Sequence, residues 1–142
     1  SILPLTQDRM VLVTSQAAGF PAVTDLSAVR QEPFVLISPQ RSPTFHQHAV
    51  DLCARHGFRP RIVQEVPEIT TVLALVKAGL GVSMIPESFS INRFPGVRTH
   101  HLTDKAAAWT VAAAWRKDDP NPLIPKFLVL LKSELAAGKG RV

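Results

Sequence analysis

Residues 65–86, EVPEITTVLALVKAGLGVSMIP, constrain the fold most strongly, because they predict a helix followed at once by a buried strand. Pro67 is expected in the first helical turn, where its missing N–H costs nothing. Gly79 can adopt the left-handed conformation that ends a helix. The apolar run at residues 82–85, stopped by Pro86, then predicts a strand in the middle of a sheet. Apolar residues recur through the helix at the spacing of one buried face: Ile69, Val72, Leu73, Val76 and Leu80.

Helices and strands alternate along the rest of the chain. After a polar turn at residues 6–8, apolar or β-branched runs predict strands at residues 9–14, 34–37, 61–65, 82–85 and 106–115. Helical spacing and start signals predict helices at residues 25–30, 43–56, 67–78 and 121–135. Residues 97–102 are expected to form an edge or crossover segment. Alternation with short connections predicts an α/β fold with a mostly parallel sheet flanked by helices.

Composition and charge exclude several classes of protein. With 142 residues, of which 46% are hydrophobic, the chain can bury a globular core. It contains neither an apolar run long enough to span a membrane nor a secretion signal, so we expect a cytoplasmic protein. The net charge of +5 comes from scattered lysines and arginines, and no helix-turn-helix can be placed, so a solvated basic surface is favoured over a nucleic-acid interface. The single cysteine, Cys53, is expected to be buried and inert.

The chain shows no catalytic or metal-binding motif, so we expect neither an enzyme nor a cofactor. Asp118 and Asp119 precede a proline and are interpreted as a solvated turn rather than an acid pair. Two pairs of histidines are each placed so that their members point to different sides and cannot share a metal: His46 with His48, and His100 with His101.

The run Ala78-Gly-Leu-Gly-Val82, followed by Ile85-Pro86, resembles the signature of the effector-binding domain of LysR-type transcriptional regulators. Further segments are similar to this family in the same order, and the resemblance covers roughly residues 8–137. These segments are residues 32–37, 42–45, 56–60, 62–65 and 115–117, with Cys53 among them. The resemblance implies a periplasmic-binding-protein-like (type 2) fold that binds a small organic acid, such as an intermediate of aromatic degradation.

The family resemblance also implies how the chain is divided. Residues 1–106 correspond to the second effector-binding subdomain with its preceding crossover segment, residues 107–137 to a strand and helix that return to the first subdomain, and residues 138–142 to a flexible tail. The opening part of the first subdomain and the DNA-binding domain are not in the sequence. We therefore expect an incomplete effector domain, truncated at its N-terminal side, that contacts DNA only through the missing domain. Apolar residues in 107–137 without partners predict a homo-oligomer.

Ligands of open α/β sheets bind beyond the carboxyl ends of the strands, where helices begin. Two helix starts qualify here, after the loop at residues 38–43 and at Pro67. Free N–H groups at the first start would form an anion site for a carboxylate. The resemblance assigns inducer contact to the same segment, and the candidate effector-binding residues are Ser42, Pro43, Thr44, Phe45 and, more weakly, Ser38. The alternatives are that Ser42 is only a helix cap and Phe45 only core, and that the chain is a solute-binding protein for a small anion.

Overall fold

The computed structural model describes residues 1–90 and 94–138, and the chain divides into two compact units. The larger unit is Asp8–Trp109, and the smaller one combines Ser1–Gln7 with Thr110–Val142. The chain therefore passes between the units twice, once after Gln7 and once after Trp109. None of the helices in the described part of the chain is long and apolar enough to cross a membrane.

Five strands, three α-helices and three short 3-10 helices are described in the larger unit. Most of its elements agree with the sequence prediction to within two residues. The strands are β1 (Ile2–Ser15, which enters from the smaller unit), β2 (Pro33–Ile37), β3 (Arg61–Val66), β4 (Ser83–Pro86) and β5 (Val97–His101). The helices are α1 (Pro43–Arg55), α2 (Ile69–Lys77) and α3 (Glu87–Ser90), with 3-10 turns at Gln16–Ala18, Leu26–Val29 and Lys105–Ala107.

The strands pair in both directions. β2 and β3 are parallel, and Val82, just before β4, forms a parallel bridge to Phe34 of β2. β4, β1 and β5 lie side by side in that order in one sheet, while β2 and β3 form a two-stranded sheet. The bridge at Val82 joins the two sheets beside β4, so β4 is flanked on both sides, as its apolar sequence predicts. However, β1 runs antiparallel to both β4 and β5, which corrects the expected mostly parallel pairing for this part of the sheet. An apolar run shows that both faces of a strand are buried but does not fix its direction. The α/β class itself is confirmed.

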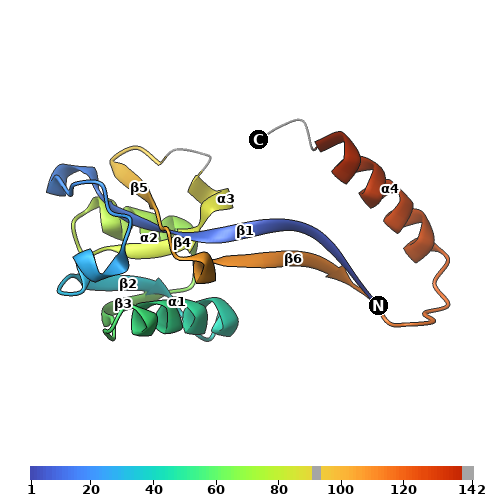
Figure 1. Cartoon of the computed structure of the whole chain (residues 1–142), viewed down its shortest axis with the longest axis horizontal. Helices are drawn as coiled ribbons and strands as arrows, with labels where there is room; N and C mark the ends of the chain where they lie inside the picture. The colour runs from blue at the N-terminus through green and yellow to red at the C-terminus, as the bar shows by residue number, and fades with distance from the viewer. Residues whose placement is uncertain (91–93, 139–142) are drawn as a thin grey trace. The chain divides into compact units, whose positions relative to one another are not determined.

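Two apolar cores lie on opposite faces of the sheet. Alternate residues of a strand point to opposite sides, and β1 shows this directly, because Met10 and Leu12 pack in one core and Val11 and Val13 in the other. The first core is completed by α1 and the second by α2. Both helices thus hold their N-terminal ends in fixed positions beside the sheet (Figure 1).

The start of α2 differs from the prediction. Glu68 is the N-cap residue and the helix begins at Ile69, so Pro67 lies before the helix rather than in its first turn. Val66 is held in β3, where its carbonyl accepts a 2.8 Å hydrogen bond from the N–H of Ser38. A residue that precedes proline also disfavours the helical conformation. The helix ends as predicted, since Gly79 has φ +83°, but this turn leaves Leu80 42% exposed instead of buried.

The smaller unit contains the first half of β1, paired with β6 (Ala108–Ala114), and the helix α4 (Leu123–Gly138). The pairing extends to the chain start, where the Ser1 amino group donates to the Trp115 carbonyl at 2.9 Å (Figure 1). The turn predicted at residues 6–8 is wrong, because β1 is continuous there. Asn121 does cap α4, its Oδ1 accepting from the Leu123 N–H at 3.0 Å. The helix includes Gly138, expected in the tail, and residues 139–142 lie outside the described part.

Candidate functional site

A hollow of about 290 Å³ lies at the carboxyl ends of three strands of the larger unit. β2 ends there with Ile37 and β4 with Pro86, and Pro67 follows the end of β3. Both helix starts considered in the sequence open onto this same hollow, which fulfils the geometric rule for ligand sites in α/β sheets. The described lining residues are Ile37, Arg41, Ser42, Phe45, Pro67, Glu68, Ile69, Thr70, Pro86 and Phe89.

The lining combines apolar walls with a polar rim. Phe45, Ile69 and Phe89 supply apolar surface, while the hydroxyl groups come from the two helix starts. At the rim, Arg41 and Glu68 form an ion pair at 3.8 Å, with side chains 64% and 60% exposed. An ion pair this exposed contributes little to stability, so the Arg41 guanidinium can exchange its partner at small cost. This arrangement suits a small molecule with an apolar body and an anionic group.

The start of α1 leaves polar groups free. Ser42 occupies the N-cap position, yet within the described part of the chain its side chain makes no capping hydrogen bond. The first hydrogen bond of the helix runs from the His46 N–H to the Ser42 carbonyl at 3.0 Å, so the N–H groups of Thr44 and Phe45 precede it. The positive end of the helix dipole adds to these donors. The site can therefore stabilise an anion without a charged side chain.

The structure separates the five residues predicted to bind an effector. Ser42 and Phe45 both line the hollow. Pro43 and Thr44 instead line a shallow depression on α1, together with Gln47, His48 and Asp51. Ser38 is among the described lining residues of neither; its backbone supports the loop, because its carbonyl accepts from the N–H groups of Arg41 and Ser42 at 3.1 and 3.0 Å. Ile69, Thr70 and Phe89 were not predicted, although Pro67 already marked the helix start beside two of them.

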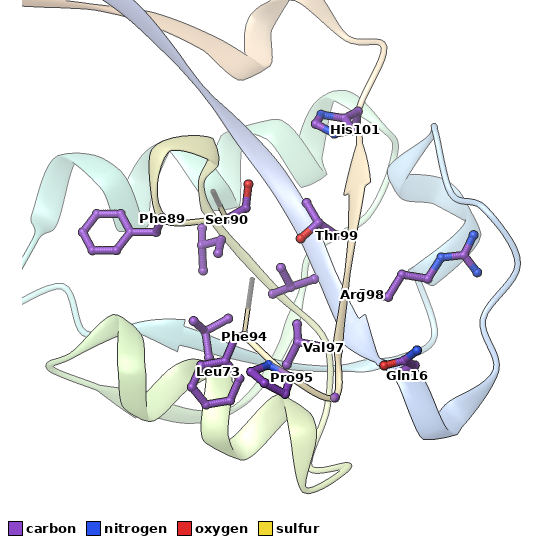
Figure 2. A pocket seen from close by; sticks show the side chains of 13 residues that line it. Gln16, Leu73, Phe89, Ser90, Phe94, Pro95, Val97, Arg98, Thr99 and His101 are labelled. Carbon is purple, nitrogen blue, oxygen red and sulfur yellow. The ribbon is translucent and has the colours of Figure 1, made fainter. Parts of the chain in front are cut away.

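A second hollow, of about 500 Å³, lies near β5. Figure 2 shows Leu73, Phe94 and Val97 close together at this hollow, while the Arg98 side chain points away from them. The Arg98 guanidinium is engaged, since its Nη1 donates to the Phe20 carbonyl at 2.7 Å. This hollow has no helix start facing it among the described elements, and its lining adjoins the undescribed residues 91–93. We therefore place the candidate site at the first hollow.

Other reactive groups of the larger unit have structural partners. His46 Nε2 lies 3.0 Å from a Glu65 carboxylate oxygen, and His48 Nε2 donates to the Ala106 carbonyl at 2.6 Å. The two histidines therefore face different partners, as their spacing predicts. Among the described residues, no group of three or more His, Cys, Asp or Glu side chains could hold a metal ion. Cys53 is fully buried, and burial raises the pKa of its thiol to about 12.

The fold agrees with what comparison with known proteins shows. A family model described as the LysR substrate binding domain matches residues 1–136. The chain belongs to this family. The HTH-type transcriptional regulator IlvR of Caulobacter vibrioides, a LysR-family relative, is 33% identical over 94% of the chain. The match spans 45% of that regulator, so the chain corresponds to about half the length of this relative.

Solved LysR effector domains show the same fold. The BenM effector binding domain, solved with its effector benzoate, has a TM-score of 0.78 at 21% identity, covering 98% of this chain and 64% of that one. The effector binding domain of QuiR, solved in complex with shikimate, has a TM-score of 0.75 at 21% identity, covering 99% of this chain and 66% of that one. The curated relative is named as a transcriptional regulator, and this supports the regulatory interpretation over its alternative.

Proposed function

We propose that the unit Asp8–Trp109 is the second effector-binding subdomain of a LysR-type transcriptional regulator and binds a small organic carboxylate in the 290 Å³ hollow. The observation that carries this proposal is that two helix starts face one apolar hollow. BenM and QuiR, which share the fold, bind benzoate and shikimate respectively, and both ligands are small ring carboxylates.

The geometry supports a specific orientation of the carboxylate. At α1, the Ser42 hydroxyl makes no capping hydrogen bond within the described part of the chain, and the Phe45 N–H precedes the first hydrogen bond of the helix, so both can donate to an anion. At α2, the first helical hydrogen bond runs from the Val72 N–H to the Glu68 carbonyl at 3.1 Å, so the N–H groups of Ile69 and Thr70 precede it. The carboxylate lies between these helix starts, and the ring of the ligand packs against Phe45, Ile69 and Phe89.

The regulator acts by converting occupancy into a conformational change. A ligand shifts a two-state equilibrium only by its difference in affinity for the two states. In the complete regulator, we propose, the carboxylate favours one arrangement of the effector domain and so alters DNA binding by a helix-turn-helix domain outside residues 1–142. The proposed protein is a homo-oligomer in the cytoplasm, since regulators of this kind position two DNA-binding domains by symmetry.

A thermal-shift titration tests the proposal. The longer regulator and this chain are each titrated with benzoate, muconate and shikimate, and with benzamide as the neutral partner of benzoate. A ligand at about 100 times its Kd stabilises the folded state by about 2.7 kcal/mol. We expect one or more carboxylates to raise Tm in the regulator and benzamide to leave it unchanged. Equal shifts from benzoate and benzamide, or none from any carboxylate, would contradict the proposal.

A further inference from the structure

The ring of Phe45 has two environments. One part lines the 290 Å³ hollow, and the ring also meets the indole of Trp109 edge-on, with centroids 5.9 Å apart and planes at 84°. An edge-to-face pair at this distance is an attractive and directional contact. A molecule that moves or pins the Phe45 ring therefore acts on Trp109 as well.

Trp109 is also held from a second position on α1. The His48 ring lies 5.7 Å from the indole at 74°. His48 and Phe45 are three residues apart, so both rings project from the same side of the helix. His48 is fixed in turn, because its Nε2 donates to the Ala106 carbonyl at 2.6 Å. The indole thus rests against two adjacent side chains of the helix that starts at the proposed site.

Trp109 lies where the chain leaves the larger unit, so its contact with Phe45 can affect the residues that follow. Trp109 is the last residue of the larger unit, and the next peptide bond leads into Thr110 of the smaller one. It belongs to β6, the strand that makes this crossing. Trp109 is not among the described residues that line the hollow, so an occupant would act on it through Phe45.

We propose that Trp109 is a positioning residue that passes occupancy of the hollow, through the Phe45 ring, to the backbone where β6 leaves the larger unit. This inference rests on the proposed function for the location of the site. It specifies how occupancy of the hollow would be transmitted. The effect passes from the start of α1 to the Phe45 ring, then to the Trp109 indole, and then to the residues of β6 that follow Trp109.

The test fills the hollow covalently, so that it needs no knowledge of the natural ligand. Trp115→Phe leaves Trp109 as the single tryptophan in a chain that has two tryptophans and no tyrosine. Ser42→Cys then places a thiol in the hollow, while Cys53 stays unreactive because its pKa is raised to about 12. Benzyl methanethiosulfonate labels the new thiolate: a disulfide forms to the benzylthio group, and methanesulfinate leaves.

The proposal requires that labelling change two measured properties, the quenching of Trp109 fluorescence and the amide exchange of the residues after it. Labelling is expected to change iodide quenching of Trp109 fluorescence about two-fold, and to change amide exchange at Thr110 and Val111 about three-fold, while exchange in β3 stays constant. Absence of either change overturns the proposal.

Two matched variants check the route. Ala54→Cys carries the same label on an exposed position of α1 that is not among the described lining residues, and it should change neither readout. Phe45→Leu in the Ser42→Cys background keeps an apolar side chain but removes the ring, and it should abolish both responses. A response to the Ala54→Cys label, or one that survives Phe45→Leu, overturns the proposal.

The labelling experiment and the carboxylate titration fail independently. The benzylthio group carries no charge, so a labelled hollow that shifts Trp109 supports the route even where no carboxylate binds. Conversely, carboxylate binding without any effect of the label would leave the proposed function intact and overturn this inference.

Discussion

The Nε2 atom of His100 lies 2.8 Å from the Thr14 hydroxyl between the neighbouring strands β5 and β1. On the other side of the ring, Nδ1 accepts a hydrogen bond from the Val23 N–H at 3.1 Å. Because Nδ1 is an acceptor, the proton of the neutral ring is on Nε2, which donates to Thr14. The buried ring therefore ties the loop before Leu26 to the sheet only while it is uncharged.

We expect this histidine to make the fold sensitive to mild acid. Burial lowers the pKa of His100, and the positive charge of Arg98 and the neighbouring His101 lower it further. The unfolded chain then binds a proton at a higher pH than the folded one, so the free energy of unfolding falls as pH drops below about 6.5, the usual histidine value. Urea unfolding at pH 8 and pH 5.5 measures the loss.

The matched variant for this prediction is His100→Gln, whose amide can both accept from Val23 and donate to Thr14 without titrating. Its unfolding free energy should depend less on pH across this window than that of the unaltered chain. Identical pH dependence in the two proteins would show that His100 is not responsible.

Asp104 should stabilise the fold at neutral pH. Hydrogen bonds from Arg55 and then from the Ala106 N–H hold the pKa of Asp104 below its usual value, and His56 Nε2 lies 3.0 Å from the same carboxylate. We expect Asp104→Asn to lower the unfolding free energy by about 1–2 kcal/mol at pH 7, a modest figure because Arg55 is largely exposed. Since a depressed carboxylate pKa stabilises only above about pH 4, the difference should shrink as pH falls through that region.

The control for Asp104→Asn is Asp118→Asn, which removes the same negative charge from an exposed turn. Asp118 has φ +60°, a conformation that asparagine also tolerates. Denaturant unfolding of Asp118→Asn should match the unaltered chain within about 0.5 kcal/mol. Equal losses from both substitutions would mean that net charge, rather than the Asp104 contacts, sets the effect.

Gly81 should tolerate alanine less well than Gly79. A Cβ at Gly81 would overlap the Pro33 carbonyl oxygen. This oxygen accepts a 2.8 Å hydrogen bond from the Val82 N–H, which joins β2 to the segment leading into β4. Gly79 faces open space, so only its φ of +83° opposes a side chain. We expect Gly81→Ala to cost about 2–3 kcal/mol and Gly79→Ala about 1–2 kcal/mol in denaturant unfolding. A larger loss of stability from Gly79→Ala than from Gly81→Ala would refute the explanation that close packing against Pro33 requires a glycine at position 81.

Two substitutions at the start of α1 should weaken the effector response of the complete regulator. Phe45→Ala removes an apolar wall of the hollow, and Thr44→Pro removes a backbone donor in the first turn, where proline is tolerated. Each is expected to raise the effector Kd about ten-fold in calorimetric titration. Gln47→Ala, exposed and not among the described residues lining the hollow, is the control. Unchanged affinity in both variants would show that the segment at residues 43–45 is not the site.

Cys53 should be unreactive until the chain unfolds. Its thiol is fully buried, with a pKa raised to about 12, so very little thiolate is present or accessible at pH 8. We expect labelling by a chromogenic disulfide to be at least about 100-fold slower in buffer than in denaturing urea. Comparable rates in the two solvents would mean that α1 opens readily.

Most of the fold could be predicted from the sequence because its signals are local. The apolar spacing of residues 69–76 and the proline at the start of α1 depend on a few neighbours, and both helices form where they predict. The direction of β1 could not be predicted from the sequence, because Val11 and Val13 would be buried in a parallel or an antiparallel strand alike. The start of β1 was missed because residues 2–8 owe their strand conformation to pairing with β6, over a hundred residues away.

The candidate site was predicted only in part for a related reason. The helix starts at Ser42 and Pro67 are visible in the sequence, but their convergence on one hollow is a property of the parallel pairing of β2 and β3. Phe89 joins them from the short helix α3, for which the sequence offers no periodic signal. Which side of α1 faces the hollow also depends on tertiary packing, and this separates Ser42 and Phe45 from Pro43 and Thr44.

The edge strand β3 bears on how this chain behaves while it folds. Val63 is 41% exposed on this strand, whose outer side has no partner strand among the described residues. Arg59 and Arg61 flank its beginning, with Pro60 between them. Charges and proline at an edge oppose the addition of a strand from another molecule. We therefore expect these three residues to raise the concentration at which refolding chains begin to aggregate, independently of how stable the finished fold is.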